Sequence, residues 1–312
     1  MKDNKNMKQG FKIGTYLVGV GFFFLLISVI VGGFDVFKVT AERKEKEYSF
    51  KSNYEVISLE TITEDIIIRP SDDDKIHLKT SESKEEYYKI ENAKNLTISE
   101  AGKEPWYRKF FNVGNFNVSI ELYLPEDLDT KLVLDSKDGE VDISDVSIKS
   151  LDVKSNNEDF YAENVIAKKD ISVTNNNAVI KLEKIQAENI VLENNDSLIK
   201  LEDLKVQSLK AKNKNDDIFL KNTQAIKKVS FETVNGEIDI YNLDLTESLN
   251  INNKDGDIFV DLSQKEKDYQ FDLEAKNDEA IINGKERQGK TGNSDKLIFI
   301  RNINGEIELK TK

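Results

Sequence analysis

One stretch of the sequence matches a motif with known chemistry. Residues 284–291, GKERQGKT, follow the spacing G-x-x-x-x-G-K-[S/T] of a phosphate-binding loop. Such a loop needs a helix directly after it, because the helix N-terminus points its backbone N–H groups at the phosphates. Here Gly292, Asn293 and Ser294 follow, and then the strand-like LIFI. We therefore interpret the match as a coincidental loop and expect no nucleotide cofactor.

Acidic clusters and a single histidine are the other candidate reactive groups. The clusters at 72–74 and 216–217 offer the oxygen ligands that Ca²⁺ prefers. The nonapeptide of calcium β-rolls and the EF-hand loop are both missing from the sequence, so we interpret these acids as solvated turn residues and expect no metal site. His77 stands between Ile76 and Leu78, which predicts a strand. Either the histidine faces solvent and the two apolar residues face the core, or the two sides are exchanged.

Composition removes several classes of function. The chain has 312 residues and no cysteine, which excludes disulfides, thiolate zinc sites, cysteine nucleophiles and a lipid anchor on cysteine. The formal net charge of −13 argues against nucleic acid as a partner. No pair among the 58 acidic residues is marked out for glycosidase chemistry. We predict that the protein is not an enzyme and keep a glycan-cleaving β-helix enzyme as the least favoured alternative.

A turn signal recurs with a nearly constant spacing of 19 or 20 residues, which indicates repeated structural units. We take the second residue of each Asp/Asn-X pair as the marker of its repeat. The glycine form of the signal occurs at Gly139, Gly236 and Gly256 of this series and at Gly305 beyond it. The markers of the central series are Gly139, Glu158, Ala178, Ser197, Asp216, Gly236 and Gly256.

Apolar residues alternate on both sides of every marker, which predicts two short strands with one buried face. Three residues before the marker stands Ser, Thr or Asn, and we expect these side chains to stack into hydrogen-bonded ladders along a corner. The residue directly before the marker is Asp or Asn, types that tolerate a positive φ, so we expect the tight turn there.

Two architectures fit this pattern. In a β-solenoid each repeat is one coil, and equivalent positions stack about 4.8 Å apart. In an antiparallel meander each Asp-Gly or Asn-Gly would close a hairpin. The constant period favours the solenoid, so we predict an all-β, β-solenoid or β-helix-like body over 131–312, preceded by an irregular β region or cap over 51–130.

The N-terminal region has the character of a membrane anchor. Residues 13–34 contain no charge and, as a helix, would measure roughly 33 Å, enough to span a bilayer. We predict a short tail over 1–10, one transmembrane helix over 11–34 and a charged stalk over 35–50. A cleaved signal peptide is the alternative, although the apolar run is long for one. Lys and Arg are nearly balanced on the two sides; we favour a body outside the cell.

Several segments resemble a known family. They are ITEDIIIRPSDDDKIHLK near the start of the body, NLTI at 95–98, VSIELYLPEDL at 118–128, and the recurring DGEVDI, NGEIDI, DGDIFV and NGEIEL. Over roughly residues 50–312 the chain resembles membrane-anchored Gram-positive proteins of the "putative adhesin" β-strand-repeat family, the domain of unknown function 4097. The resemblance implies a right-handed β-solenoid-like fold, a surface location and no established catalysis.

An aromatic segment interrupts the cap at 105–116. We expect it to cover the open end of the solenoid; the alternative is a loop that contacts the membrane or a partner. The candidate residues of this loop are Trp106, Tyr107, Arg108, Lys109, Phe110 and Phe111.

The predicted function is a membrane-anchored surface protein whose solenoid is an adhesin-like binding scaffold. Its partners would be the lipid bilayer, through the N-terminal helix, and an unidentified protein or cell-wall component. The alternative function is an accessory regulator in cell-envelope stress signalling that acts through another membrane protein.

Overall fold

The computed structural model describes residues 43–84, 86–102 and 118–312, together with Val18, Val20, Gly21 and Phe23. The tail predicted over 1–10 and most of the helix predicted over 11–34 lie outside the described residues. No helix in the part of the chain that the structure describes is long and apolar enough to cross a membrane. The segment 35–50, predicted as a stalk, contributes Lys44–Phe50 to the sheet as β1, antiparallel to β4 (Ile76–Glu82).

Strands one repeat apart in the sequence lie side by side and run parallel. Leu151 of β11 is in register with Leu132 on one side and Ile171 on the other, which are offsets of 19 and 20 residues. A meander would instead pair consecutive strands antiparallel. The prediction of an all-β solenoid is therefore confirmed and the meander is excluded, while the right-handed winding stays a prediction.

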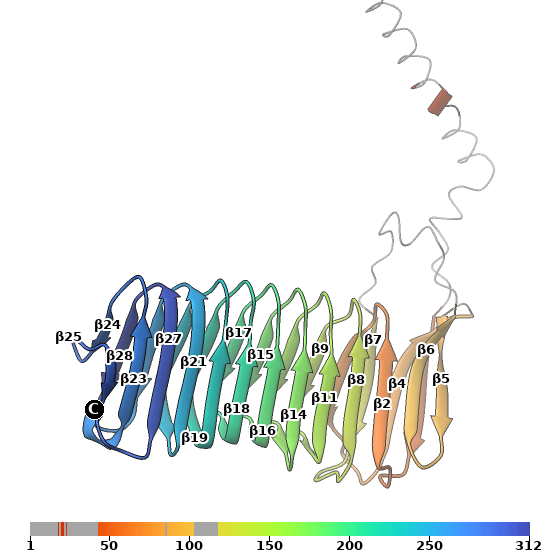
Figure 1. The fold of residues 1–312 in the computed structure, drawn as a ribbon. Helices are drawn as coiled ribbons and strands as arrows, with labels where there is room; N and C mark the ends of the chain where they lie inside the picture. Colours follow the sequence, from red (N-terminus) through yellow and green to blue (C-terminus); the bar gives the residue numbers. More distant parts are fainter. Residues whose placement is uncertain (1–17, 19, 22, 24–42, 85, 103–117) are drawn as a thin grey trace, which may run out of the picture.

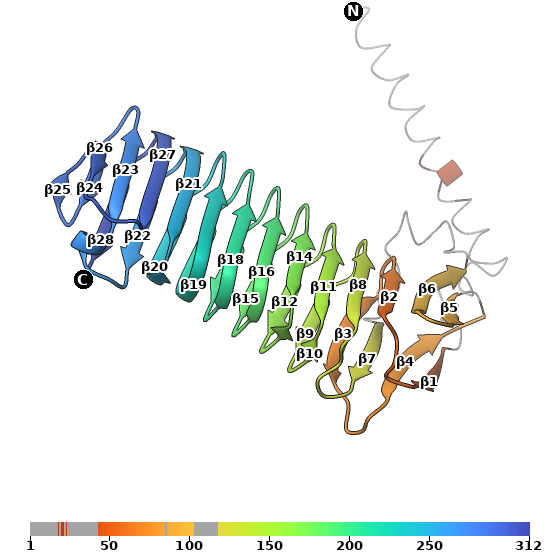
Figure 2. The same ribbon diagram turned by 60° about the horizontal axis from the view of Figure 1, so that its bottom comes forward.

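Each coil contributes one strand to each of two long parallel ladders (Figures 1 and 2). The first ladder holds, in spatial order, β6 (Leu96–Gly102), β2 (Val56–Thr61), β8 (Lys131–Ser136), β11 (Ser150–Lys154), β14 (Asp170–Thr174), β16 (Gln186–Glu193), β18 (Lys205–Lys212), the end of β19 (Ile218–Glu232), β21 (Ser248–Asp255), β27 (Leu297–Asn304) and β23 (Gln270–Ala275).

The second ladder lies on the other side of the turns that carry the markers. It holds β7 (Ser119–Leu124), β3 (Asp65–Pro70), β9 (Val141–Ser144), β12 (Phe160–Glu163), β15 (Ile180–Glu183), β17 (Ile199–Glu202), the start of β19, β20 (Ile238–Leu245), β22 (Ile258–Leu262), β28 (Ile307–Thr311) and β24 (Ala280–Ile282). A third ladder contains β10 (Ser147–Ile148), β13 (Ile166–Ala167), the first residues of β16 and β18, the middle of β19 and the end of β20.

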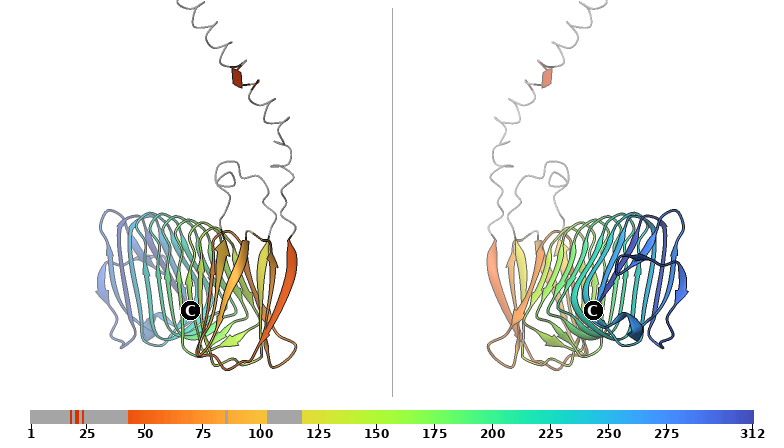
Figure 3. Two further views of the ribbon diagram at one scale, coloured as in Figure 1. Left: turned by 90° about the vertical axis from the view of Figure 1, so that its right-hand side faces the viewer. Right: turned by 90° about the vertical axis from the view of Figure 1, so that its left-hand side faces the viewer.

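Alternation along each strand sends one set of side chains into a continuous core. In β20, Ile238 and Ile240 are fully buried while Asp239 and Tyr241 face outward. The same alternation recurs in every coil, so the core is a column made mainly of Ile, Leu and Val between the ladders. Figure 3 views the stack from its two ends, with the coils one behind another. The outward residues of each ladder consequently form straight columns on flat faces.

The corners differ from the prediction. The positive φ angles do not fall on the Asp or Asn before the marker but six residues after it, as at Asn164 (52°), just after β12, and at Asn242 (54°), within β20. Lys184 occupies this position in its coil with φ 54°. The sharp left-handed turn therefore separates the second ladder from the third, whereas at the markers only Gly256 and Gly305 among the described residues have a positive φ.

Buried polar side chains line the turn between the first two ladders, as predicted. Asn194 is 4% exposed and donates to the carbonyls of Ala178 (2.9 Å) and Ser197 (2.7 Å), the markers of the preceding coil and of its own. Asn253 bonds in the same way, and Asn213 donates to the carbonyls of Ser197 and Asp217, the residue after its own marker. These amides join successive coils inside the corner, where unpaired backbone carbonyls would otherwise be costly.

Glycine at the marker has a different role from the one that a tight turn would give it. A Cβ on Gly236 would lie 2.3 Å from the carbonyl oxygen of Asp216 in the preceding coil, and one on Gly139 would lie 2.1 Å from that of Glu64. Gly256 and Gly305 have φ of 126° and 134° and meet the same obstacle. These four predicted turn residues therefore permit close approach of stacked backbones.

At both ends the order of the coils in space differs from their order in the sequence. The coil at 56–70 lies between the coils at 96–124 and 131–148. The last coil, 297–311, lies between those at 248–262 and 270–282. The outer edges are finished by antiparallel strands: β1 and β5 (Glu86–Asn92) at one end, and β25 (Lys285–Glu286) and β26 (Gly289–Thr291) at the other.

Candidate interaction surface

The candidate loop of the sequence analysis, Trp106 to Phe111, lies outside the described residues. The described strands on either side of it, β6 and β7, belong to the same end of the solenoid as β1, because β7 pairs with β4 and β4 with β1. The loop's role as a cap or a contact surface stays a prediction.

Three aromatic rings form a contiguous row on the outward face of the second ladder. Phe219 of β19, Tyr241 of β20 and Phe259 of β22 come from three successive coils. The ring centroids of Phe219 and Tyr241 are 5.6 Å apart, and those of Tyr241 and Phe259 are 5.0 Å apart. Tyr241 is 37% exposed and the two phenylalanines are half-buried. We call Phe219, Tyr241 and Phe259 the aromatic row.

The sheet geometry explains why the rings meet. Each ring residue lies between inward residues of its strand, such as Ile218 and Leu220 beside Phe219, so its side chain must point out of the core. Parallel stacking places Phe219 and Phe259 at equivalent positions on either side of β20, and Tyr241 contacts both from two residues beyond the matching position of that strand. The rings do not belong to one sequence motif, because 18 to 22 residues separate them along the chain.

Lysines cover both ends of the aromatic row. The Nζ atom of Lys200 lies 5.8 Å from the centroid of Phe219, and that of Lys310 lies 4.7 Å from the centroid of Phe259. Each lysine is also paired with a carboxylate of its own strand: Lys200 with Glu202 at 3.3 Å and Lys310 with Glu308 at 3.2 Å. The ends of the row are therefore polar, but their charges are compensated.

A half-buried carboxylate lies within the row. Asp239 is in register with Phe219 on one side and Phe259 on the other, and it stands two residues before Tyr241 on the same face of β20. Burial, and then the carboxylate of Asp217, raise the pKa of Asp239 above its ordinary value. The row thus combines three ring faces with a hydrogen-bonding group at its centre.

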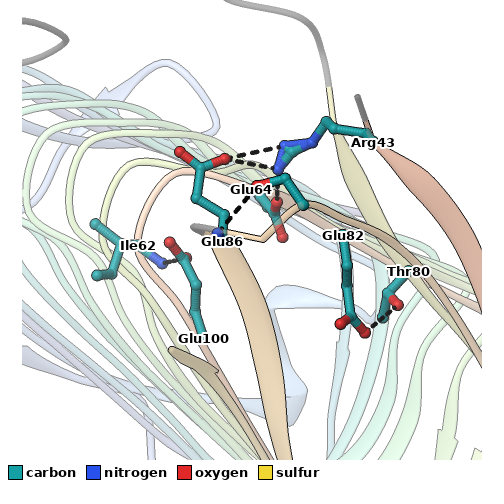
Figure 4. Close-up of polar contacts among 8 residues, drawn as sticks. Arg43, Ile62, Glu64, Thr80, Glu82, Glu86 and Glu100 are labelled. Carbon is teal, nitrogen blue, oxygen red and sulfur yellow. Dashed lines mark hydrogen bonds and ion pairs between the residues drawn. The ribbon is translucent and has the colours of Figure 1, made fainter. Parts of the chain in front are cut away.

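A second polar cluster lies at the N-terminal end of the solenoid (Figure 4). Arg43 donates to Glu64 Oε1 (2.8 Å) and to Glu86 Oε2 (3.0 and 3.2 Å). Glu100 accepts a hydrogen bond from the backbone N–H of Ile62 at 2.7 Å. One guanidinium therefore serves two carboxylates, and a third lies in the same cluster.

Glu64 is the carboxyl most perturbed by this crowding. It is 6% exposed, and its Oε2 atom is buried without a hydrogen-bond partner. Burial, followed by the Glu100 carboxylate, raises the pKa of Glu64 to about 8; Arg43 opposes the rise and Glu86 adds to it. The ion pair at 2.8 Å and the raised pKa are compatible, because the single cation is shared. We infer that the cluster holds a proton near neutral pH.

Glu82, in contrast, is a buried acid whose carboxylate has three hydrogen-bond donors. It is 3% exposed and accepts hydrogen bonds from Lys46 (2.6 Å), Tyr48 (3.0 Å) and Thr80 (3.0 Å). These contacts join β1 to β4 and fix the first described strand to the solenoid.

In each of the two acidic clusters considered in the sequence analysis, a carboxylate accepts a hydrogen bond from the protein's own backbone. Asp73 Oδ1 accepts from the backbone N–H of Lys75 (2.9 Å) and contacts His77 Nε2 (2.8 Å), and the histidine contact, followed by the backbone bond, lowers the pKa of Asp73. Asp217 accepts from the backbone N–H of Glu237 at 2.7 Å. No group of three or more metal-ligating side chains occurs within residues 43–84, 86–102 and 118–312. His77 faces outward between the buried Ile76 and Leu78.

The segment that matches the phosphate-loop pattern forms β25 and β26. These strands run antiparallel to β24 and β23, and the next element is β27. A phosphate-binding loop requires a helix directly after it, and here a strand follows. The segment therefore does not have the geometry of a phosphate-binding loop.

Sequence reasoning missed the aromatic row, although the signal was present. The search for repeats used the inward positions, which share one residue class from coil to coil. The outward position three residues after the marker varies: it is Tyr161, Lys181, Lys200, Phe219, Asp239 and Phe259 in successive coils. Comparing this variable column between coils would have found two of the three rings.

The family model described as Toastrack DUF4097 matches residues 54–311. No functionally curated protein is similar enough in sequence to match the chain. The solved structures that match this chain align with most of its length and nearly all of their own, but at low sequence identity. Such a likeness transfers no binding activity.

Three solved structures illustrate the likeness. A "putative adhesin" from Bacteroides fragilis has 12% identity and a TM-score of 0.46, over 87% of this chain and 99% of that one. One from Parabacteroides merdae has 14% identity and a TM-score of 0.35, over 88% and 97%. A "putative cell adhesion protein" from Clostridium sporogenes has 13% identity and a TM-score of 0.32, over 87% and 100%.

Proposed function

The chain belongs to the Toastrack DUF4097 family, and we propose that it is a non-catalytic binding scaffold held at the outer face of a cell membrane. The observation that carries this proposal is the aromatic row on the flat outward face of the second ladder. Large rings on a rigid sheet present contact area with little loss of conformational entropy on binding, which is what a binding surface needs. The core and the corner amides hold this face in place.

The membrane part of the proposal rests on the sequence. Residues 13–34 are an uncharged run long enough to span a bilayer. The first described residues after that run, Arg43 and β1, are fastened to the solenoid by ion pairs with Glu64, Glu86 and Glu82. An anchored N-terminus would therefore hold the body close to the membrane.

Protease treatment of intact cells tests this topology. The full chain, with an epitope tag after Lys312, is expressed in cells that are then exposed to a non-specific protease. We expect the tag to be lost from intact cells, while a cytosolic protein in the same cells is untouched. A tag that survives on intact cells and is lost only after lysis contradicts an exterior body.

Binding is tested separately with the full chain in detergent micelles. We expect the protein to sediment with purified cell envelopes. It should stay bound through washes that keep the solenoid folded and contain no competing ligand. Failure to sediment with envelopes, under conditions where circular dichroism shows an intact β fold, contradicts the scaffold function.

The second candidate is an accessory regulator that meets another membrane protein. The Arg43 cluster favours it, because that cluster couples the chain nearest the proposed anchor to the first coils of the solenoid. Deletion of residues 1–34 separates the two functions. Loss of a membrane-protein partner in co-purification supports the regulator, and retention of that partner by the deletion variant contradicts it.

A further inference from the structure

The aromatic row carries an inference about the kind of ligand that it binds, and this inference rests on the proposed scaffold function. We propose that Phe219, Tyr241 and Phe259, with Asp239 at their centre and Lys200 and Lys310 at the two ends, form a stacking platform for a neutral polysaccharide chain.

The shape of the platform fits a sugar ring. A pyranose has a flat face of C–H groups and a rim of hydroxyls, so it needs an apolar surface bordered by donors and acceptors. Centroid spacings of 5.6 and 5.0 Å, with 39° between neighbouring ring planes, bring the three rings into contact as one apolar patch. This arrangement follows the sheet face, where a linear polymer can lie across several coils.

The polar groups around the rings supply both kinds of hydrogen bond. Asp239 accepts, and the ammonium groups of Lys200 and Lys310 donate. Lys221, which is exposed and two residues after Phe219, adds a further donor beside Tyr241, with which it is in register. A purely apolar partner would leave these groups desolvated and unpaired, which is costly.

Charge points to a neutral chain. The lysines that flank the rings already have carboxylate partners, Glu202 and Glu308, so the platform offers little net charge of either sign. Residues 1–34 hold four lysines and one aspartate and so carry a formal charge of +3. Because the whole chain carries −13, residues 35–312 carry −16. A polyanion would approach a surface of the same sign and would be repelled.

Titration calorimetry with the full chain in detergent micelles tests the proposal. The probes are cellohexaose and the hexamer of N-acetylglucosamine, with polygalacturonate as the anionic comparison. We expect at least one neutral hexamer to bind with a Kd that changes less than about twofold between low and high salt, since uncharged ligands release no counterions. Polygalacturonate should bind at least about tenfold more weakly.

Ring substitutions locate the site. The triple variant Phe219→Ala, Tyr241→Ala and Phe259→Ala should abolish binding, and Tyr241→Ala alone should weaken it about tenfold, because each stacking contact contributes on the order of a tenfold change. Phe299→Ala is the matched control: it is a half-buried outward ring on the first ladder that carries a cation contact, with Arg301 at 4.7 Å. That variant should bind like the original chain.

Several outcomes overturn the proposal. They are the absence of binding by both neutral hexamers, equal binding by the triple variant, equal loss in Phe299→Ala, or tighter binding of the polyanion. A triple variant that loses self-association in sedimentation velocity, without any change in sugar binding, also overturns it and assigns the row to a second copy of the chain. If both hexamers fail while the protein still sediments with cell envelopes, the glycan assignment fails and the scaffold function stands.

Discussion

Replacing Glu64 by Gln isolates the effect of one buried carboxyl on stability. The side chain keeps its size and an oxygen that can accept from Arg43, but it loses its titration. In the folded protein the carboxyl has a pKa of about 8, against an ordinary value of 4.5. Above pH 4.5 this carboxyl is ionised in the unfolded chain but stays protonated in the folded chain until the pH approaches 8. A rise in pH therefore favours unfolding.

The size of the effect follows from the two pKa values. Each pKa unit corresponds to about 1.4 kcal/mol, so between pH 5 and pH 9 the free energy of unfolding should fall by about 4 kcal/mol on account of Glu64 alone. Stability from this group is present in acid and is lost as the pH rises toward the folded value of about 8. In Glu64→Gln that part of the pH dependence should vanish. The variant should match the original chain near pH 5 and exceed it at pH 9.

Urea unfolding of the full chain, followed by far-ultraviolet circular dichroism at pH 5, 7 and 9, measures the difference. Glu91→Gln is the control. It removes an exposed acid whose pKa is lowered by a hydrogen bond from Lys89, so it does not titrate in this range. Equal pH slopes for the original chain and Glu64→Gln, or the same change of slope in Glu91→Gln, would refute a shared proton in the Arg43 cluster.

Three further substitutions probe the stack itself by chemical denaturation. Gly236→Ala should destabilise by about 1–3 kcal/mol, since its Cβ would lie 2.3 Å from a backbone carbonyl of the preceding coil, whereas Ser197→Ala at the equivalent marker should have little effect. Asn194→Ala should cost about 1–3 kcal/mol because it removes two buried hydrogen bonds; its exposed neighbour Asn195→Ala should cost well under 1 kcal/mol, and equal losses would contradict the corner ladder. Ile300→Ala, in the fully buried core of the last coil, should cost about 2–5 kcal/mol, and a loss below 1 kcal/mol would show that this coil is not packed as described.

The sequence was most informative where every coil has the same physical requirement. Inward positions need apolar side chains, and the corner needs a short polar group that reaches two carbonyls, so residues such as Ile238 and Asn194 repeat and can be read as a period. The left-handed corner was misplaced because Asp and Asn also occur directly before the marker, where they form exposed amide ladders such as Asn177 to Asn157 (2.7 Å). Residue type alone does not distinguish these two uses.

The candidate surfaces escaped sequence analysis for a different reason. The aromatic row and the Arg43 cluster each join residues that are distant in the chain and occupy positions where no repeat constraint acts. Arg43 and Glu86 are 43 residues apart, and they meet only because β5 and β1 finish the same end of the solenoid. Such contacts depend on the order of the coils, which a period cannot specify.

That order has a physical consequence at the two ends. A solenoid that stopped after its last coil in sequence order would expose a parallel edge ready to pair with another chain. Here the chain first makes the outer coil at 270–282, turns back through β25 and β26, and then places its final strands, β27 and β28, between two coils already made. The C-terminal strands are thus paired on both sides, and the edges of the outer coil are covered by the short antiparallel strands β25, on β24, and β26, on β23. The mirror arrangement of the coil at 56–70 at the other end gives the same protection, so the stack ends in a fixed place and its flat faces, rather than its edges, remain available for binding.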